Sequence, residues 1–331
     1  IRDQHDYRVA LFDAKGRKLT GRSYSAVVEP VFEYFDDGDI NPGDIFISND
    51  PYNQGAGTHL NDCGLVLPVY FEDELVAFAT VNAHWTDVGG MHPGSMTPSA
   101  TEIFQEGLRI PIIKFSEGGI PNKAVWDMIS LNVRTPDEVL GDLQAQIASC
   151  KSGEEGMCEL FERYGVKQIL NYGRQIQDYA EQITRAEISE FPNGEYSFTD
   201  QIDGLGENPE TIIINTKVII ADNSITVDFD GTSQQVAAGI NPSFPFTKAA
   251  TYAALRSVME SDIPNCHGFT LPIEVKAPLG SLVNPKFPAP CGARGVTGYR
   301  IIDCLFGALS QALPFFLFAD RQVNPASVNA C

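Results

Sequence analysis

The chain has 331 residues, of which 43% are hydrophobic and 20% charged, proportions typical of a folded globular protein and not of a disordered or fibrous one. Lysine and arginine number 23 against 43 aspartate and glutamate residues, which gives a formal net charge of −20. A surface this negative repels phosphate backbones and anionic lipid, so we expect no nucleic-acid partner. We also expect no membrane insertion, because Asp303 and Pro314 interrupt the most apolar stretch, 301–318.

The cysteines and the N-terminus bear on the cellular location. Seven cysteines lie at scattered positions without a Cys-x-x-Cys pair, which argues against both a disulfide framework and a thiolate zinc site. The N-terminus has neither the basic region nor the apolar region of a signal peptide, and it lacks an initiator methionine. We therefore expect a reducing, cytoplasmic location and a sequence whose start is missing.

The first 120 residues read mainly as strands. Runs at 7–12 and 18–23 flank a turn at Ala14-Lys15-Gly16 and predict a hairpin. Apolar residues at helical spacing within 25–35 predict one helix. The apolar runs 64–71 and 75–81 flank the acidic Glu72-Asp73-Glu74, a connection of hairpin length. A second hairpin is therefore expected there.

The second hairpin brings together residue types that bind metals. Asp62 and His84 lie eleven residues on either side of Asp73, so a turn centred on Asp73 places them opposite each other at the open end of the ladder. His59 lies one turn upstream, at the end of a glycine-rich loop. Two imidazoles and a carboxylate suit a divalent ion such as Zn, Mn or Fe, with positions left open for water or substrate. The alternative for any one histidine is an ordinary core or surface residue.

Two further residues follow the predicted ligands. Asp87 comes three residues after His84 and is expected to orient an imidazole from behind the ligands; ligation or capping of a turn are its alternatives. His92, within Met91-His92-Pro93-Gly94, either faces the same pocket or is a loop residue.

The rest of the chain alternates helices and strands, which together with the first 120 residues predicts an α+β fold with a hairpin-borne metal site and a helical middle segment. Helices are expected at 125–129, 136–150, 159–182, 246–260 and 296–313, with Gly153, Gly156, Gly165 and Gly173 as breaks or caps, and strands at 194–201, 211–220 and 224–229. A proline-rich stretch covers 264–290. This pattern divides the chain into a β-rich metal-site region (1–120), a helical segment (121–190) and an α+β region (191–331), which we expect to form one intertwined unit.

Motifs around the predicted ligands resemble those of the hydantoinase B family. They are Ser48-Asn49-Asp50-Pro51-Tyr52, Gly57-Thr58-His59-Leu60-x-Asp62, Ala83-His84-x-x-Asp87-x-Gly89-Gly90 and His92-Pro93-Gly94-Ser95-Met96. The similarity continues in the same order through Glu106-Gly107-x-x-Ile110-Pro111, Val133-Arg134-x-Pro136, Gly141-Asp142-Leu143, Asp262-Ile263-Pro264-Asn265 and Arg300-Ile301-x-Asp303. The resemblance therefore covers nearly the whole chain.

The resemblance implies a function that is divided between subunits. The family includes B subunits of ATP-dependent hydantoinases and oxoprolinases, caprolactamase, and the corresponding subunits of acetone and acetophenone carboxylases. It implies that an A-type partner binds ATP with Mg and phosphorylates the substrate, and that the B-type subunit completes hydrolysis or carboxylation in a hetero-oligomer. By similarity to the acetone carboxylase branch, a Mn-type site falls on His59, Asp62 and His84. Asp87 or His92 would then move the proton.

Two departures from the family pattern are visible. Trp85 stands where many members carry a second histidine, so that histidine's role does not transfer to this chain. Relatives are also expected to extend beyond both ends of this sequence.

The leading hypothesis is a metal-binding catalytic subunit that hydrolyses a cyclic amide such as a hydantoin, 5-oxoproline or a lactam. The alternative is a subunit of a carboxylase that takes a ketone and bicarbonate, for which Trp85, Phe244 and Phe246 are candidate pocket residues. Two other classes stay open: a non-haem iron oxygenase, whose facial triad has the same ligand types, and a scaffold subunit with a structural metal.

Overall fold

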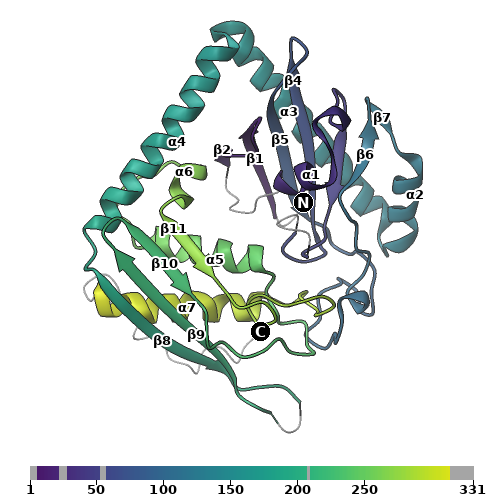
Figure 1. Ribbon diagram of the computed structural model, residues 1–331. Coiled ribbons are helices and arrows are strands. Elements are labelled where there is room, and N and C mark those ends of the chain that lie inside the picture. Colours follow the sequence, from purple (N-terminus) through teal and green to yellow (C-terminus); the bar gives the residue numbers. More distant parts are fainter. Residues whose placement is uncertain (1–5, 22–27, 53–56, 207–208, 314–331) are drawn as a thin grey trace.

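The computed structural model describes residues 6–21, 28–52, 57–206 and 209–313 and builds them into two sheets connected by long helices (Figure 1). The first sheet has seven antiparallel strands in the order β2-β1-β5-β4-β3-β6-β7. Its strands are β1 (Tyr7–Asp13), β2 (Lys18–Gly21), β3 (Ile45–Ser48), β4 (Asp62–Phe71), β5 (Glu74–His84), β6 (Ile113–Glu117) and β7 (Ile120–Pro121). The predicted hairpins at both 7–23 and 64–81 are present, although 22–27 lie outside the described residues.

The β4–β5 hairpin has the predicted pairing at its open end, where Asp62 lies opposite His84. The turn itself differs from the expectation. Its two central residues are Glu72 and Asp73, with φ of 49° and 63°, the left-handed conformation of a two-residue hairpin turn. That turn pairs Phe71 with Glu74, and an irregularity next to Val69 then shifts the register by one residue. The bulge thus restores the alignment that brings Asp62 to His84.

Both faces of the first sheet are covered, which explains why β4 and β5 read as continuous apolar runs. One face packs against α3 (Pro136–Tyr164) and α2 (Lys123–Asn132) through a large core cluster that includes Leu65 and Val81. The other face packs against the short helix α1 (Glu29–Tyr34) through a smaller cluster around Phe46 and Phe78. The hairpin is therefore held rigidly from both sides.

The helical segment is more continuous than predicted. α3 runs through Gly153 and Gly156 to Gly165, which has φ of 82° and ends the helix as expected, and α4 (Val166–Ser189) then runs through Gly173 to the second sheet (Figure 1). Close packing explains two of these glycines. A Cβ on Gly153 would lie 3.1 Å from Ala79 of β5, and one on Gly173 would lie 2.9 Å from Leu19 of β2.

The second sheet has four strands in the order β11-β10-β9-β8. β8 (Gly194–Ile202), β9 (Ile212–Ala221) and β10 (Ser224–Asp228) match the predicted strands, whereas β11 (Ile273–Lys276) and the one-turn helix α6 (His267–Thr270) were missed within the proline-rich stretch. α7 (Gly295–Ala312) packs on β8, β9 and α5 (Phe244–Ser257) (Figure 1). A second core cluster joins these elements to α4.

The observed mixture of helices and mainly antiparallel strands, with one parallel pair between β10 and β11, confirms the predicted α+β class. The division at 120 and 190 stays a proposal, although β7 and α4 end close to those positions. Among the described residues, none of the helices combines the length and apolarity that spanning a membrane requires. The predicted helix 296–313 corresponds to α7, and the tail after 313 lies outside the described residues.

Candidate metal centre

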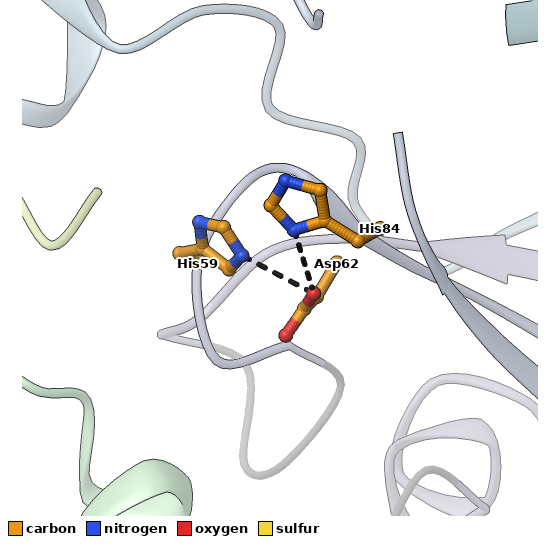
Figure 2. Close-up of side chains that lie close together, drawn as sticks. All are labelled: His59, Asp62 and His84. Carbon is orange, nitrogen blue, oxygen red and sulfur yellow. Dashed lines mark ion pairs between the residues drawn. The ribbon is translucent and has the colours of Figure 1, made fainter. Parts of the chain in front are cut away.

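The three predicted ligands converge at the open end of the β4–β5 hairpin, and Figure 2 shows both imidazoles facing the Asp62 carboxylate. His59 Nε2 lies 3.2 Å and His84 Nδ1 lies 3.4 Å from Asp62 Oδ1. The two imidazole ring centroids are 5.0 Å apart, and one ligand atom from each of the three residues lies within 4.8 Å of the others. The separations match a set of side chains that could share one cation.

Two asparagines hold the turn that carries His59 and Asp62. Asn49 Nδ2 donates to the Leu60 carbonyl oxygen at 2.7 Å, and Asn61 Nδ2 donates to the Trp85 carbonyl oxygen at 2.9 Å. The chain before His59 passes so close to Asn49 that a Cβ on Gly57 would lie 2.5 Å from the Asn49 carbonyl oxygen. The turn is therefore fixed by the backbone on both sides of the ligands.

The His59 side chain is fully buried. Within the described segments of the chain neither of its ring nitrogens has a hydrogen-bond partner, although Nε2 approaches the carboxylate of Asp62. A buried ring nitrogen without a partner costs about 1 to 3 kcal/mol. A cation shared by His59 Nε2 and the Asp62 carboxylate would remove this cost at Nε2. The residues present therefore fit a divalent metal with nitrogen and oxygen ligands.

The protonation states also suit a cation. Burial, reinforced by the nearby Arg294, lowers the pKa of His59 to about 4, so its imidazole is neutral near pH 7. Burial opposes ionisation of Asp62, but the neighbouring His59, His84 and Arg294 outweigh it and hold the pKa of this carboxyl well below its usual range. A neutral imidazole and an ionised carboxylate are the forms in which these groups bind metals.

The fold adds residues that the sequence reasoning missed. Arg294, immediately before α7, donates through Nη2 to Thr58 Oγ1 at 2.8 Å and to Asp62 Oδ2 at 3.2 Å. The Thr58 hydroxyl also donates to Asp62 Oδ2. Asp6, before β1, brings Oδ2 to 4.0 Å from His84 Nδ1. Arg294 is more than 230 positions from Asp62 in the sequence, so no local pattern reveals the pair.

Asp87 and His92 lie in the loop after β5, outside the group of three. The Asp87 carboxylate is buried and accepts hydrogen bonds from the backbone of Gly89, Gly94 and Arg134, and from Arg134 Nη1 at 2.9 Å. Burial disfavours its ionisation, but these bonds outweigh that effect and lower its pKa. His92 is exposed, with Nε2 at 3.5 Å from Ser99 Oγ. Their predicted catalytic roles stay predictions.

Two neighbours of the ligands belong to the core. Trp85 is fully buried, and its Nε1 donates to Gln146 Oε1 of α3 at 2.8 Å. Gln146 Nε2 in turn donates to the Cys63 carbonyl oxygen at 2.9 Å. Burial, followed by the charge of Asp62, keeps the pKa of the Cys63 thiol well above its usual value. Trp85 therefore supports the hairpin end from behind, and Cys63 packs in the core.

Comparison with known proteins identifies relatives along the whole chain. The β subunit of caprolactamase from Pseudomonas jessenii is 31% identical over 320 residues, which cover 94% of this chain and 54% of that protein. The crystal structure of the ATP-dependent caprolactamase from the same organism superimposes with a TM-score of 0.88 at 30% identity, covering 94% of this chain and 55% of the matched chain. The chain thus spans about half the length of these curated relatives.

A second solved structure shares the fold. The nucleotide-free structure of acetone carboxylase superimposes with a TM-score of 0.85 at 17% identity, covering 96% of this chain and 44% of the matched chain. The sequence profile of the family described as Hydantoinase B/oxoprolinase matches residues 1–330. With motifs, fold and sequence in agreement, the chain belongs to the Hydantoinase B/oxoprolinase family.

Proposed function

We propose that this chain is the metal-binding catalytic subunit of a hetero-oligomeric, ATP-dependent enzyme that hydrolyses a cyclic amide. His59, Asp62 and His84 hold the divalent ion, with Zn or Mn as the first choices and Fe as the third. An A-type partner subunit binds ATP with Mg and phosphorylates the substrate. The site of action is the cytoplasm.

The observation that carries this proposal is the buried, unpaired imidazole of His59 facing Asp62 and His84. Such a group is costly unless a ligand satisfies it. Family membership supports the proposed reaction class, and the relative at 31% identity is named as a caprolactamase subunit. The identity to acetone carboxylase is 17%, so that similarity supports the fold alone, and we prefer a hydantoin, 5-oxoproline or lactam over a ketone with bicarbonate.

In the proposed reaction, the residues around the ligands have separate tasks. Arg294 and Thr58 fix the Asp62 carboxylate, so that one oxygen faces the two imidazoles. Asp6 is close enough to His84 to orient its ring or to add a further oxygen ligand. The chemistry that a bound divalent ion supplies is polarisation of a carbonyl oxygen or activation of water.

The loop after β5 carries the two candidate proton-transfer residues, Asp87 and His92. Asp87, already saturated with hydrogen bonds, holds this loop to Arg134, while His92 is the exposed group that is free to exchange a proton with the substrate. We therefore propose His92 as the proton-transfer residue, with Asp87 acting directly only if the loop opens.

Substrate-dependent ATP hydrolysis tests the proposal. The full-length chain would be purified with its natural A-type partner and assayed with 5-oxoproline, hydantoin and caprolactam, and separately with acetone plus bicarbonate. We expect one of the cyclic amides to stimulate ATP hydrolysis. Stimulation by the ketone with bicarbonate alone would replace the hydrolase with the carboxylase, and turnover that needs iron and oxygen but no ATP would indicate the oxygenase.

A pair of histidine variants separates catalysis from scaffolding. His84→Ala is expected to give a folded, assembled enzyme that has lost its metal and its activity, while the control His267→Ala, on α6, keeps both. A His84→Ala chain that fails to fold or assemble would instead support a structural metal.

A further inference from the structure

We propose that α4 carries an interface through which two copies of this chain pair, with their α4 helices antiparallel about a two-fold axis at Gln175 and Ile176. The inference goes beyond the proposed function and does not depend on the metal. It is carried by three features of α4, which are its exposed apolar side chains, the side of the helix on which its charges lie, and the nearly palindromic order of its outward residues.

The outward side of α4 is more apolar than its inward side. Figure 1 shows α4 at the outer edge of the molecule, where it connects the two sheets. The side chains that the helix buries are Gln177, Ala180, Thr184 and Ile188. By contrast, Tyr172 is 49%, Ile176 45% and Tyr179 56% exposed. Single exposed apolar residues are ordinary in a folded protein, but three large ones on one side of a helix indicate an interaction surface.

The three exposed residues belong to a stripe that has the spacing of paired helices. At intervals of 3, 4, 3 and 4 residues, the stripe consists of Ile169, Tyr172, Ile176, Tyr179 and Ile183. This is the spacing of the apolar seam in a coiled coil. The two outer isoleucines already pack partly against the two large core clusters of the chain. A second helix that lies along the stripe would cover the three exposed residues between them.

The charged residues of α4 lie on a different side of the helix from the stripe. Arg174 and Asp178 are each two positions from Ile176, and Glu181 is five positions from it. Residues at these separations point to another side of a helix with 3.6 residues per turn, whereas those three or four apart share a face. The exposed residues that flank the stripe are the neutral Gln168, Gln175 and Gln182. The outward face of α4 is therefore uncharged from 168 to 183.

An uncharged face suits a second copy of the chain. The chain has a formal net charge of −20, so two copies repel each other wherever their acidic surfaces meet. A basic partner would bind acidic groups, because interfaces between oppositely charged proteins bring complementary charges together. The α4 face offers no acidic side chain to such a partner, and it brings no like charges together when it meets its own copy. Charge therefore favours self-association at this face.

The face also has nearly the same order of residues from either end. Three pairs of identical residues flank its centre, and they are Gln168 with Gln182, Ile169 with Ile183, and Tyr172 with Tyr179. The midpoint of each pair falls at position 175, at position 176 or between them. An antiparallel copy centred there places glutamine opposite glutamine, isoleucine opposite isoleucine and tyrosine opposite tyrosine. A two-fold interface needs such a self-complementary patch, since each copy contributes the same residues.

The size of the face sets the expected strength of the pairing. Residues 168–183 span about 24 Å of helix at 1.5 Å per residue. Two helices paired over this length bury less than the roughly 800 Å² per partner of a standard interface. We therefore expect a reversible dimer, with a Kd of about 10 µM.

Cysteine cross-linking in the full-length chain, purified with its natural partner subunit, tests the pairing directly. At the two-fold axis Ile176 faces its own equivalent in the second copy, and a disulfide forms only where the two Cα atoms come within about 7 Å. Ile176→Cys is therefore expected to give a disulfide-linked dimer under mild oxidation. The controls are the wild type and Arg174→Cys on the charged side of the helix, which should stay unlinked. No linked dimer from Ile176→Cys, or equal linkage from Arg174→Cys, would overturn the proposal.

Sedimentation at a series of concentrations measures the strength of the same contact. Ile176→Glu should raise the Kd of the dimer about tenfold or more, because it brings two carboxylates together in an apolar contact, while Arg174→Glu should leave the Kd unchanged. The proposal is overturned if the wild type carries one copy at every concentration, if Ile176→Glu pairs as tightly as wild type, or if Ile176→Glu releases the partner subunit instead. Should Ile176→Glu not fold, the cross-linking result decides.

Discussion

Glu106 provides a quantitative test of how the loop before α7 is held. Its carboxylate is fully buried and accepts backbone hydrogen bonds from Cys291 at 3.0 Å and Gly292 at 2.7 Å. Cys291 and Gly292 lie three and two positions before Arg294, so Glu106 anchors the segment that carries the arginine to the metal ligands. Burial raises the pKa of Glu106 from 4.5 to about 7, although the two N–H groups favour the charged form.

This raised pKa makes stability depend on pH. Below pH 4.5 the carboxyl is protonated in both the folded and the unfolded chain, and between 4.5 and about 7 only the folded chain keeps the proton. The contribution of Glu106 is thus fully present in acid and is lost as the pH rises. This difference in the pKa of Glu106 between the folded and the unfolded chain corresponds to about 3 kcal/mol of unfolding free energy. In Glu106→Gln the unfolding free energy relative to wild type should therefore rise by about that amount from pH 4 to pH 8.

Denaturant unfolding at several pH values between 4 and 8 measures this difference. The amide introduced by Glu106→Gln offers one acceptor oxygen where the carboxylate offers two, which adds a cost, but that cost does not change with pH. The exposed Glu102 in the same loop is the matched control, since the unfolding free energy of Glu102→Gln should change with pH as that of the wild type does. A difference in unfolding free energy between Glu106→Gln and wild type that stays constant from pH 4 to pH 8 would refute the prediction.

Two further predictions concern the support around the ligands. Gln146→Leu leaves the Trp85 indole N–H and the Cys63 carbonyl oxygen without their partner and should lower the unfolding free energy by about 2 to 4 kcal/mol. In a double-mutant cycle with Trp85→Phe, the two losses of unfolding free energy should add up to less than their sum. Strict additivity would argue against an interaction between Trp85 and Gln146. Asp87→Asn should cost about 3 kcal/mol through its lost pairing with Arg134. Because the pKa of Asp87 is lowered, its contribution is present above the ordinary value of 3.8 and is lost as the pH falls below it, so equal acid sensitivity of wild type and Asp87→Asn in unfolding experiments would contradict this role.

The β4–β5 hairpin could be predicted because its information is local. Two apolar runs and a short polar connection fix the pairing of Asp62 with His84, and the type of turn and the bulge compensate each other. The glycines of α3 and α4 misled the reasoning for a different reason. Gly153 and Gly173 are glycine because a strand passes close to each helix, and a single sequence does not distinguish close packing from a helix end.

The wider site could not be predicted because its residues are far apart in the sequence. Arg294 reaches Asp62 only because α7 packs on the second sheet and begins beside the first. Asp6 approaches His84 because β1 pairs with β5. The family motifs mark many of these segments, but no periodicity or spacing states which of them meet.

The central claim is that His59, Asp62 and His84 share one divalent ion. The most direct measurement is a crystal structure of the natively purified protein with diffraction data collected at the absorption edges of Zn, Mn and Fe. The account predicts a single strong anomalous peak among His59, Asp62 and His84, which disappears in His59→Ala. Absence of a peak in wild type, with the imidazole of His59 bonded to water or to protein instead, would contradict it.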